Sequence, residues 1–174
     1  MEFNASSVQL LKINADSLVL PTGSQLENVA KEIDEALDGA ITSLIESGDF
    51  SGKASESCVL LNLNTPFQRI ILVGTDGASN PQKMIKAIEA GASAVFKTPA
   101  VSAVWAIEGL AEDHDWQANI VARSTMTAAY QYSGTGKNPE PKKLKTVTYW
   151  CANKSDANTA NQGLNYGGAI GNGM

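Results

Sequence analysis

The sequence is poor in several residue types on which common functions depend. It contains one histidine, two cysteines and six prolines among 174 residues, and aromatic residues make up only 6%. Its 13 Lys and Arg are outnumbered by 18 Asp and Glu, which gives a net charge of -5. This balance repels phosphate backbones and anionic membranes at long range, so nucleic acid is not the default partner.

Long apolar runs are also absent. The apolar stretch at residues 8–20 is interrupted by Lys12, Asn14 and Asp16 and does not fit a bilayer-spanning helix. The first four residues have neither the basic start nor the apolar run of a signal peptide. We expect a cytoplasmic protein.

The two cysteines lie inside apolar, strand-like runs. Structural disulfides concentrate in small secreted domains, so Cys58 and Cys151 are predicted to be buried free thiols.

What remains is typical of one globular domain over residues 1–174. Hydrophobic residues make up 43% and charged residues 18%, and a chain of this length can bury one substantial core.

The clearest element is an amphipathic helix over residues 24–47. Apolar residues recur at steps of three and four between Leu26 and Leu44, Ser24 and Glu27 form a possible capping box, and Gly48 supplies the stop. Asp34, Glu35 and Asp38 lie off the apolar stripe and are interpreted as a solvated face.

Strands and helices then alternate. Residues 58–63 and 69–73 are predicted to be strands covered on both faces, and their short connection makes them antiparallel. A helix opens at Asn80-Pro81, with a cap residue followed by proline. Strands at 103–107 and 146–152 and helices at 115–132 and from 155 onward complete a mixed, mostly parallel α/β/α sheet.

Candidate catalytic and binding residues are few. His114 is flanked by Glu112, Asp113 and Asp115, but neighbouring loop residues rarely point at one metal, and acids suit the start of a helix. We interpret this segment as structural. Serine or cysteine catalysis needs a base within hydrogen-bond reach of the nucleophile, and the single histidine lies in this acidic segment. The sequence also contains no G-x-S-x-G nucleophile elbow.

Two other segments have a functional and a structural interpretation. The turn at residues 74–81 could hold a phosphate on its amides, but it matches neither the dinucleotide fingerprint nor the P-loop. A cluster of lysines could contact nucleic acid, but no aromatic residues interleave with it. The cluster is formed by Lys137, Lys142, Lys143 and Lys145. We favour a plain strand-to-helix turn at residues 74–81 and a solvated loop at the lysine cluster.

The three tryptophans lie in predicted core elements. Packing accounts for Trp105, Trp116 and Trp150 without a stacking role. From the residues alone, the chain is an α/β domain with no visible active site: no catalytic, cofactor-binding or metal-binding residue is assigned.

Four segments in order resemble the N-terminal domain of the leucyl aminopeptidase (cytosol aminopeptidase) family. They are residues 32–41, the "G-x-F-x-G-K" link at 48–53, the strand at 69–74 that is similar to the family's "R-I-L-L-V-G", and residues 163–170, similar to the helix that joins the two domains. The resemblance covers most of the chain but rests on arrangement more than on a diagnostic motif.

The resemblance implies a macro-domain-like fold and a non-catalytic domain. Members of this family are exopeptidases that remove N-terminal residues such as leucine, use two zinc or manganese ions, and assemble as hexamers. Their catalytic residues and metal ligands belong to a C-terminal domain, whose "N-T-D-A-E-G-R" signature has no match in this chain. We therefore expect the chain by itself to be inactive.

The alternative function is a free-standing macro-like module that binds ADP-ribose or another nucleotide. The glycine-rich end, residues 163–174, is a poor helix former and should fray unless it is packed.

Overall fold

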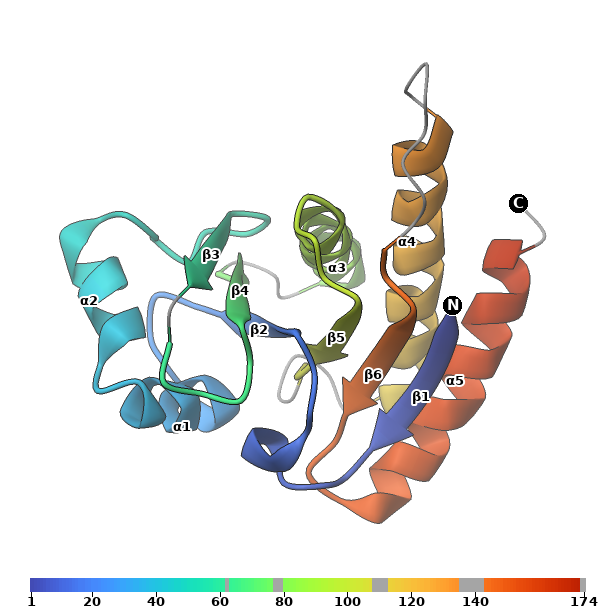
Figure 1. Cartoon of the computed structure of the whole chain (residues 1–174), viewed down its shortest axis with the longest axis horizontal. Helices are drawn as coiled ribbons and strands as arrows, with labels where there is room; N and C mark the ends of the chain where they lie inside the picture. Colours follow the sequence, from blue (N-terminus) through green and yellow to red (C-terminus); the bar gives the residue numbers. More distant parts are fainter. Residues whose placement is uncertain (62, 77–79, 108–112, 135–142, 173–174) are drawn as a thin grey trace.

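The computed structural model describes residues 1–61, 63–76, 80–107, 113–134 and 143–172. In this part of the chain one six-stranded sheet forms with the order β1-β6-β5-β2-β4-β3 (Figure 1). The strands are β1 (Glu2–Ser6), β2 (Ser17–Thr22), β3 (Ser57–Leu61), β4 (Arg69–Gly74), β5 (Ser102–Trp105) and β6 (Thr146–Trp150). The helices are the 3-10 helix η1 (Leu10–Lys12), α1 (Asn28–Ala36), α2 (Ala40–Ser47), α3 (Pro81–Phe96), α4 (His114–Gly134) and α5 (Lys154–Asn172).

The predicted fold class is confirmed. All neighbouring strands pair in parallel except β3 and β4, which are antiparallel as their short connection predicted. The sheet is therefore mixed and mostly parallel, and helices cover both of its faces.

Alternation along the central strand β2 divides the core into two layers. Leu18 and Leu20 pack with α1 and α2, whereas Val19 points to the opposite face and packs with α3 and α4. Figure 1 shows α4 and α5 side by side behind β6 and β1, while α1 and α2 lie at the β2–β4–β3 end of the sheet.

Helix α3 begins where the sequence predicts. The Asn80 side chain accepts a hydrogen bond from the Lys83 amide at 2.9 Å, and Pro81 occupies the first helical position. Buried residues on its inner face include Met84, Ile88 and Val95.

The prediction of one helix over residues 24–47 was wrong, because the chain forms two. Gly39 adopts a φ of 80°, in the left-handed region, and separates α1 from α2. The Ser24–Glu27 capping box is also absent: Glu27 makes no side-chain cap bond, and the Ser24 amide instead donates to the Asp76 carboxylate at 3.0 Å.

Asp34 is the second correction in this segment. It is 8% exposed rather than solvated. Its carboxylate accepts hydrogen bonds from the Ile41 amide at 2.8 Å and from the Thr42 amide at 3.1 Å and hydroxyl at 2.5 Å. Asp34 therefore caps α2 from α1 and fixes the angle between the two helices. Glu35 and Asp38 are exposed, as predicted.

Strand β3 departs from the prediction that both faces are covered. It lies at the edge of the sheet, and its residues alternate: Val59 and Leu61 are exposed, while Cys58 and Leu60 pack against the α1 and α2 layer. Strand β4, its inner neighbour, is buried throughout.

Helix α5 packs on α4 through its glycine-rich half. A Cβ atom at Gly163 would lie 2.0 Å from the Asp115 carbonyl oxygen, and one at Gly167 would lie 2.4 Å from the Asn119 carbonyl oxygen. The two helix backbones can approach this closely only because both positions lack a side chain. The described part of α5, which extends to Asn172, therefore meets the condition of packing under which its glycine-rich end is expected not to fray.

We predict that Gly167→Ala lowers the free energy of unfolding by about 1–3 kcal/mol, because the added methyl group forces α5 away from α4. Gly168→Ala is the matched control. Its Cβ would meet the Phe3 ring at 3.5 Å, an ordinary contact, and alanine in a helix gains up to about 1 kcal/mol over glycine. Urea unfolding in which Gly167→Ala equals Gly168→Ala in stability would contradict the close packing.

A second prediction concerns the hidden cap. Asp34→Ala should lower the free energy of unfolding by about 1–2 kcal/mol, because two amides at the start of α2 lose their acceptor. Glu35→Ala removes the same charge from an exposed neighbour and should change stability by less than about 0.5 kcal/mol. Equal effects of the two substitutions on thermal unfolding would refute the capping role.

Candidate functional site

The carboxyl ends of the parallel strands meet at one edge of the sheet, where open α/β sheets bind their ligands. The turns after β2 and β4 and the first turns of α4 and α5 all follow strands at this edge. A functional site of this domain is expected here.

The turn after β4 is already occupied by bonds within the chain. The amides of three consecutive residues donate to backbone carbonyls at 2.7–3.3 Å: Gly74 to Glu56, Thr75 to Thr22, and Asp76 to Gly52. A phosphate-binding turn needs amides that are free to face the ligand. These three are not free, and residues 77–79 of the predicted turn lie outside the described residues.

A carboxylate adds to this obstacle. The Asp76 side chain accepts from the Ser24 amide at 3.0 Å, and a Cβ atom at Gly23 would lie 2.7 Å from its Oδ1. The negative charge therefore sits between the turns after β2 and β4, where it repels an anion. Both observations favour the plain turn over a phosphate cradle.

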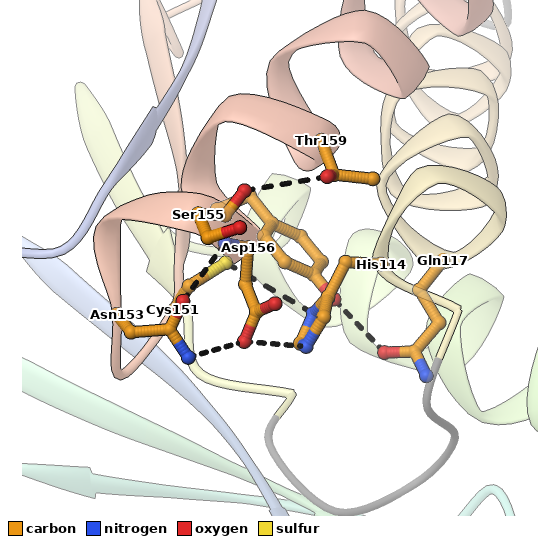
Figure 2. A network of polar contacts seen from close by, with 8 residues as sticks. His114, Gln117, Cys151, Asn153, Ser155, Asp156 and Thr159 are labelled. Carbon is orange, nitrogen blue, oxygen red and sulfur yellow. Dashed lines mark hydrogen bonds and ion pairs between the residues drawn. The ribbon is translucent and has the colours of Figure 1, made fainter.

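A polar cluster joins the starts of α4 and α5 (Figure 2). His114 Nδ1 lies 3.1 Å from the Tyr149 hydroxyl, which donates to Gln117 Oε1 at 2.9 Å. On its other side, His114 Nε2 lies 3.4 Å from the Asp156 carboxylate. The imidazole thus bridges β6, α4 and the first turn of α5.

The hydrogen bonds around the His114 imidazole hold the ring in one orientation. The Tyr149 hydroxyl donates to Gln117 Oε1, so its oxygen presents a lone pair to His114 Nδ1, 3.1 Å away. Asp156 also accepts from the Asn153 side-chain amide at 2.6 Å, and its own amide donates back to Asn153 Oδ1 at 2.9 Å. This reciprocal pair caps α5 and holds the carboxylate in front of the ring.

Burial keeps Tyr149 neutral. Desolvation raises the pKa of its hydroxyl far above the ordinary value, and the neighbouring Cys151, Asp156 and Asp113 raise it further. The phenol is therefore a hydrogen-bonding group at physiological pH and not an acid or base of catalysis.

The cluster contains a thiol, an imidazole and a carboxylate, and its thiol is buried. Cys151 Sγ lies 3.9 Å from His114 Nδ1, a contact at the limit of hydrogen bonding, and Cys151 is 1% exposed. The structural interpretation of His114 is supported by these contacts. Asp113 caps α4 by accepting from the Trp116 amide at 3.0 Å, and Glu112 lies outside the described residues.

The remaining candidates are distributed over the molecule. Lys143 and Lys145 are exposed, while Lys137 and Lys142 lie outside the described residues. Trp105 and Trp150 are buried as predicted, and Trp116 is half-buried against the core.

Both cysteines are free thiols, as predicted, although only Cys151 is buried and Cys58 is half-buried. Burial raises the pKa of the Cys58 thiol, and the charges of Asp49 and Glu56 raise it further. The Cys58 thiol is therefore protonated at neutral pH and a poor nucleophile.

Metal-ligand geometry and membrane-spanning character were not found in the described residues. Within them, no three His, Cys, Asp or Glu side chains are grouped so that they could hold a metal ion. None of the helices found there has the length and apolar character needed to cross a lipid bilayer.

Tyr149→Phe should lower the free energy of unfolding by about 1–2 kcal/mol, because His114 and Gln117 lose a buried partner. Since the pKa of Tyr149 is raised in the folded state, its contribution is complete below the unfolded pKa of about 10 and declines as the pH rises above it. The stability difference between wild type and variant should therefore be constant from pH 7 to 9 and shrink above pH 10.

Tyr166→Phe is the control for this measurement, because Tyr166 is 68% exposed. It should leave both the stability and its alkaline dependence unchanged. Denaturant titrations in which Tyr149→Phe behaves like Tyr166→Phe would show that the cluster contributes nothing to stability.

Sequence comparison identifies relatives along the whole chain. The pattern of the cytosol aminopeptidase family, N-terminal domain, matches residues 18–137. A probable cytosol aminopeptidase of Pseudomonas paraeruginosa is 30% identical over 100% of this chain, and the cytosol aminopeptidase of Pseudomonas aeruginosa is 28% identical over the same span. The chain spans 37% of the length of each of these relatives.

Solved structures share the fold. A mutant of tomato leucine aminopeptidase superposes with a TM-score of 0.78 at 18% identity, over 99% of this chain and 36% of that one. A Trypanosoma brucei macrodomain in complex with ADP-ribose gives a TM-score of 0.66 at 14% identity, over 97% of this chain and 68% of that one. These likenesses show a macro-domain-like fold, and the sequence match shows that the chain belongs to the cytosol aminopeptidase family, as its N-terminal domain.

Proposed function

We propose that this chain is the accessory, non-catalytic domain of a cytoplasmic metal-dependent leucyl aminopeptidase. The catalysis resides in a C-terminal domain that removes N-terminal residues such as leucine from peptides. That domain carries two zinc or manganese ions, and the complete enzyme forms a hexamer. The observation that carries the proposal is the family match over residues 18–137. The chain spans only 37% of the length of the cytosol aminopeptidase that it matches.

The described residues do not fit a two-metal centre. Such a centre needs several carboxylate or imidazole ligands around one point, and the described part of the chain offers no group of three. We therefore assign no catalytic step to this chain. Its role is to pack on the catalytic domain and to shape assembly or substrate access.

The alternative, a module that binds ADP-ribose, rests on the likeness to macrodomains. A shared fold does not establish a shared ligand. The bonded amides of Gly74, Thr75 and Asp76 and the Asp76 carboxylate weigh against a phosphate at that turn. Calorimetric titration with ADP-ribose should give no binding heat, and micromolar binding would favour the alternative.

The accessory function predicts that the purified chain with Mn²⁺ does not hydrolyse leucine p-nitroanilide above the buffer rate. The same chain joined to the catalytic domain of its parent reading frame should hydrolyse it. Gly163→Leu, purified in the same way, controls for contaminating peptidases, because a side chain at this position cannot fit against α4.

Hydrolysis by the wild-type chain that is absent from Gly163→Leu would refute the proposal. A parent reading frame without the "N-T-D-A-E-G-R" signature would equally count against it.

A further inference from the structure

A cavity of about 350 Å³ opens at the carboxyl ends of β1 and β6, between η1 and α1. It lies on the sheet face of Trp150, whereas Tyr149 packs toward the opposite face and holds its hydroxyl against His114 there. The cavity is thus separate from the polar cluster. Its volume is at the lower end of the range for small-molecule sites and suits a ligand of one amino-acid residue.

The base of the cavity is apolar and firmly held. It is lined by Leu10, Ile33 and Trp150, which are all buried. The Trp150 indole N–H donates to the Val8 carbonyl at 2.7 Å, which fixes the ring against the segment that leads into η1. A preformed apolar base of this kind binds an aliphatic or aromatic group without reorganising.

The rim carries a single sign of charge. Glu32, on the exposed side of α1, is the charged residue among those that line the cavity. Within the described part of the chain Glu32 makes no ion pair. A carboxylate beside an apolar base is complementary to a ligand that joins an apolar group to an ammonium.

We propose that this cavity binds a primary ammonium that carries an apolar side chain, as found in the N-terminal residue of a peptide. A free amino acid fits less well, because its carboxylate would lie close to Glu32 without a cationic partner among the described lining residues. This binding is a property of the chain by itself and does not depend on the proposed function. It provides the domain with a peptide-binding site that has no catalytic groups.

The test uses the isolated chain and leucinamide, followed by ¹H–¹⁵N NMR. We expect millimolar affinity, with the Trp150 indole and Leu11 amide resonances among those that shift. Glu32→Gln should weaken leucinamide binding about two- to fivefold, the range of an exposed ion pair. Glu35→Gln removes the same charge from an exposed position of α1 outside the cavity and should leave the affinity unchanged.

Varying the ligand separates charge from apolar contact. N-acetyl-leucinamide, which lacks the ammonium, should bind wild type and Glu32→Gln equally, and glycinamide, which lacks the side chain, should bind more weakly than leucinamide. Free leucine should also bind more weakly than leucinamide.

Three results would overturn the proposal. They are the absence of shifts in the lining residues at tens of millimolar leucinamide, equal losses for Glu32→Gln and Glu35→Gln, and equal binding of leucine and leucinamide. None of them bears on catalysis by a longer protein, so the proposed function is tested separately.

Discussion

The contact between α4 and α5 is the interaction on which much of the structure depends. Gly163 and Gly167 allow the α5 backbone to lie against the carbonyls of Asp115 and Asn119. With α5 in this position, Asn161 accepts a hydrogen bond from the Ala5 amide at 2.8 Å, and Gly168 lies on the Phe3 ring. Edge strand β1 is therefore held both by β6 and by α5, and the position of α5 depends on the absence of side chains at Gly163 and Gly167.

The same contact assembles the polar cluster. Asp156 is in the first turn of α5 and His114 is the first residue of α4, so their 3.4 Å approach requires the two helix starts to be level. The Asn153 cap then holds the carboxylate, and Tyr149 holds the other side of the ring. In this geometry the cluster joins strand β6 to the first turns of α4 and α5.

The carboxyl edge of the sheet is where backbone amides of this chain are committed to internal hydrogen bonds. Chains with a macro-domain-like fold share the arrangement of strands. In this chain the backbone amides of residues 74–76, at the turn after β4, donate hydrogen bonds to the carbonyls of residues 56, 22 and 52. The link that follows α2 lies against this turn, since a Cβ atom at Gly74 would meet the Lys53 carbonyl oxygen at 1.8 Å. The cavity between η1 and α1 also opens at this edge, and its described lining combines apolar residues with one carboxylate.

Local sequence by itself determined the elements whose signals lie within a few residues: the Asn80-Pro81 start of α3, the buried strand β4, the antiparallel turn to β3, and the order of strands and helices that fixes the fold class. It failed where the deciding partner is distant or where two patterns overlap. The apolar periodicity of residues 26–44 continues through Gly39, so it could not show the break there, nor that Asp34 turns inward to cap α2. Only the tertiary structure showed that His114, Tyr149 and Asp156 lie together. It also showed that Gly163 and Gly167 lie where a side chain would clash with α4. Those contacts join segments more than 30 residues apart, and their geometry is set by the pairing of strands and the approach of helices rather than by any local pattern.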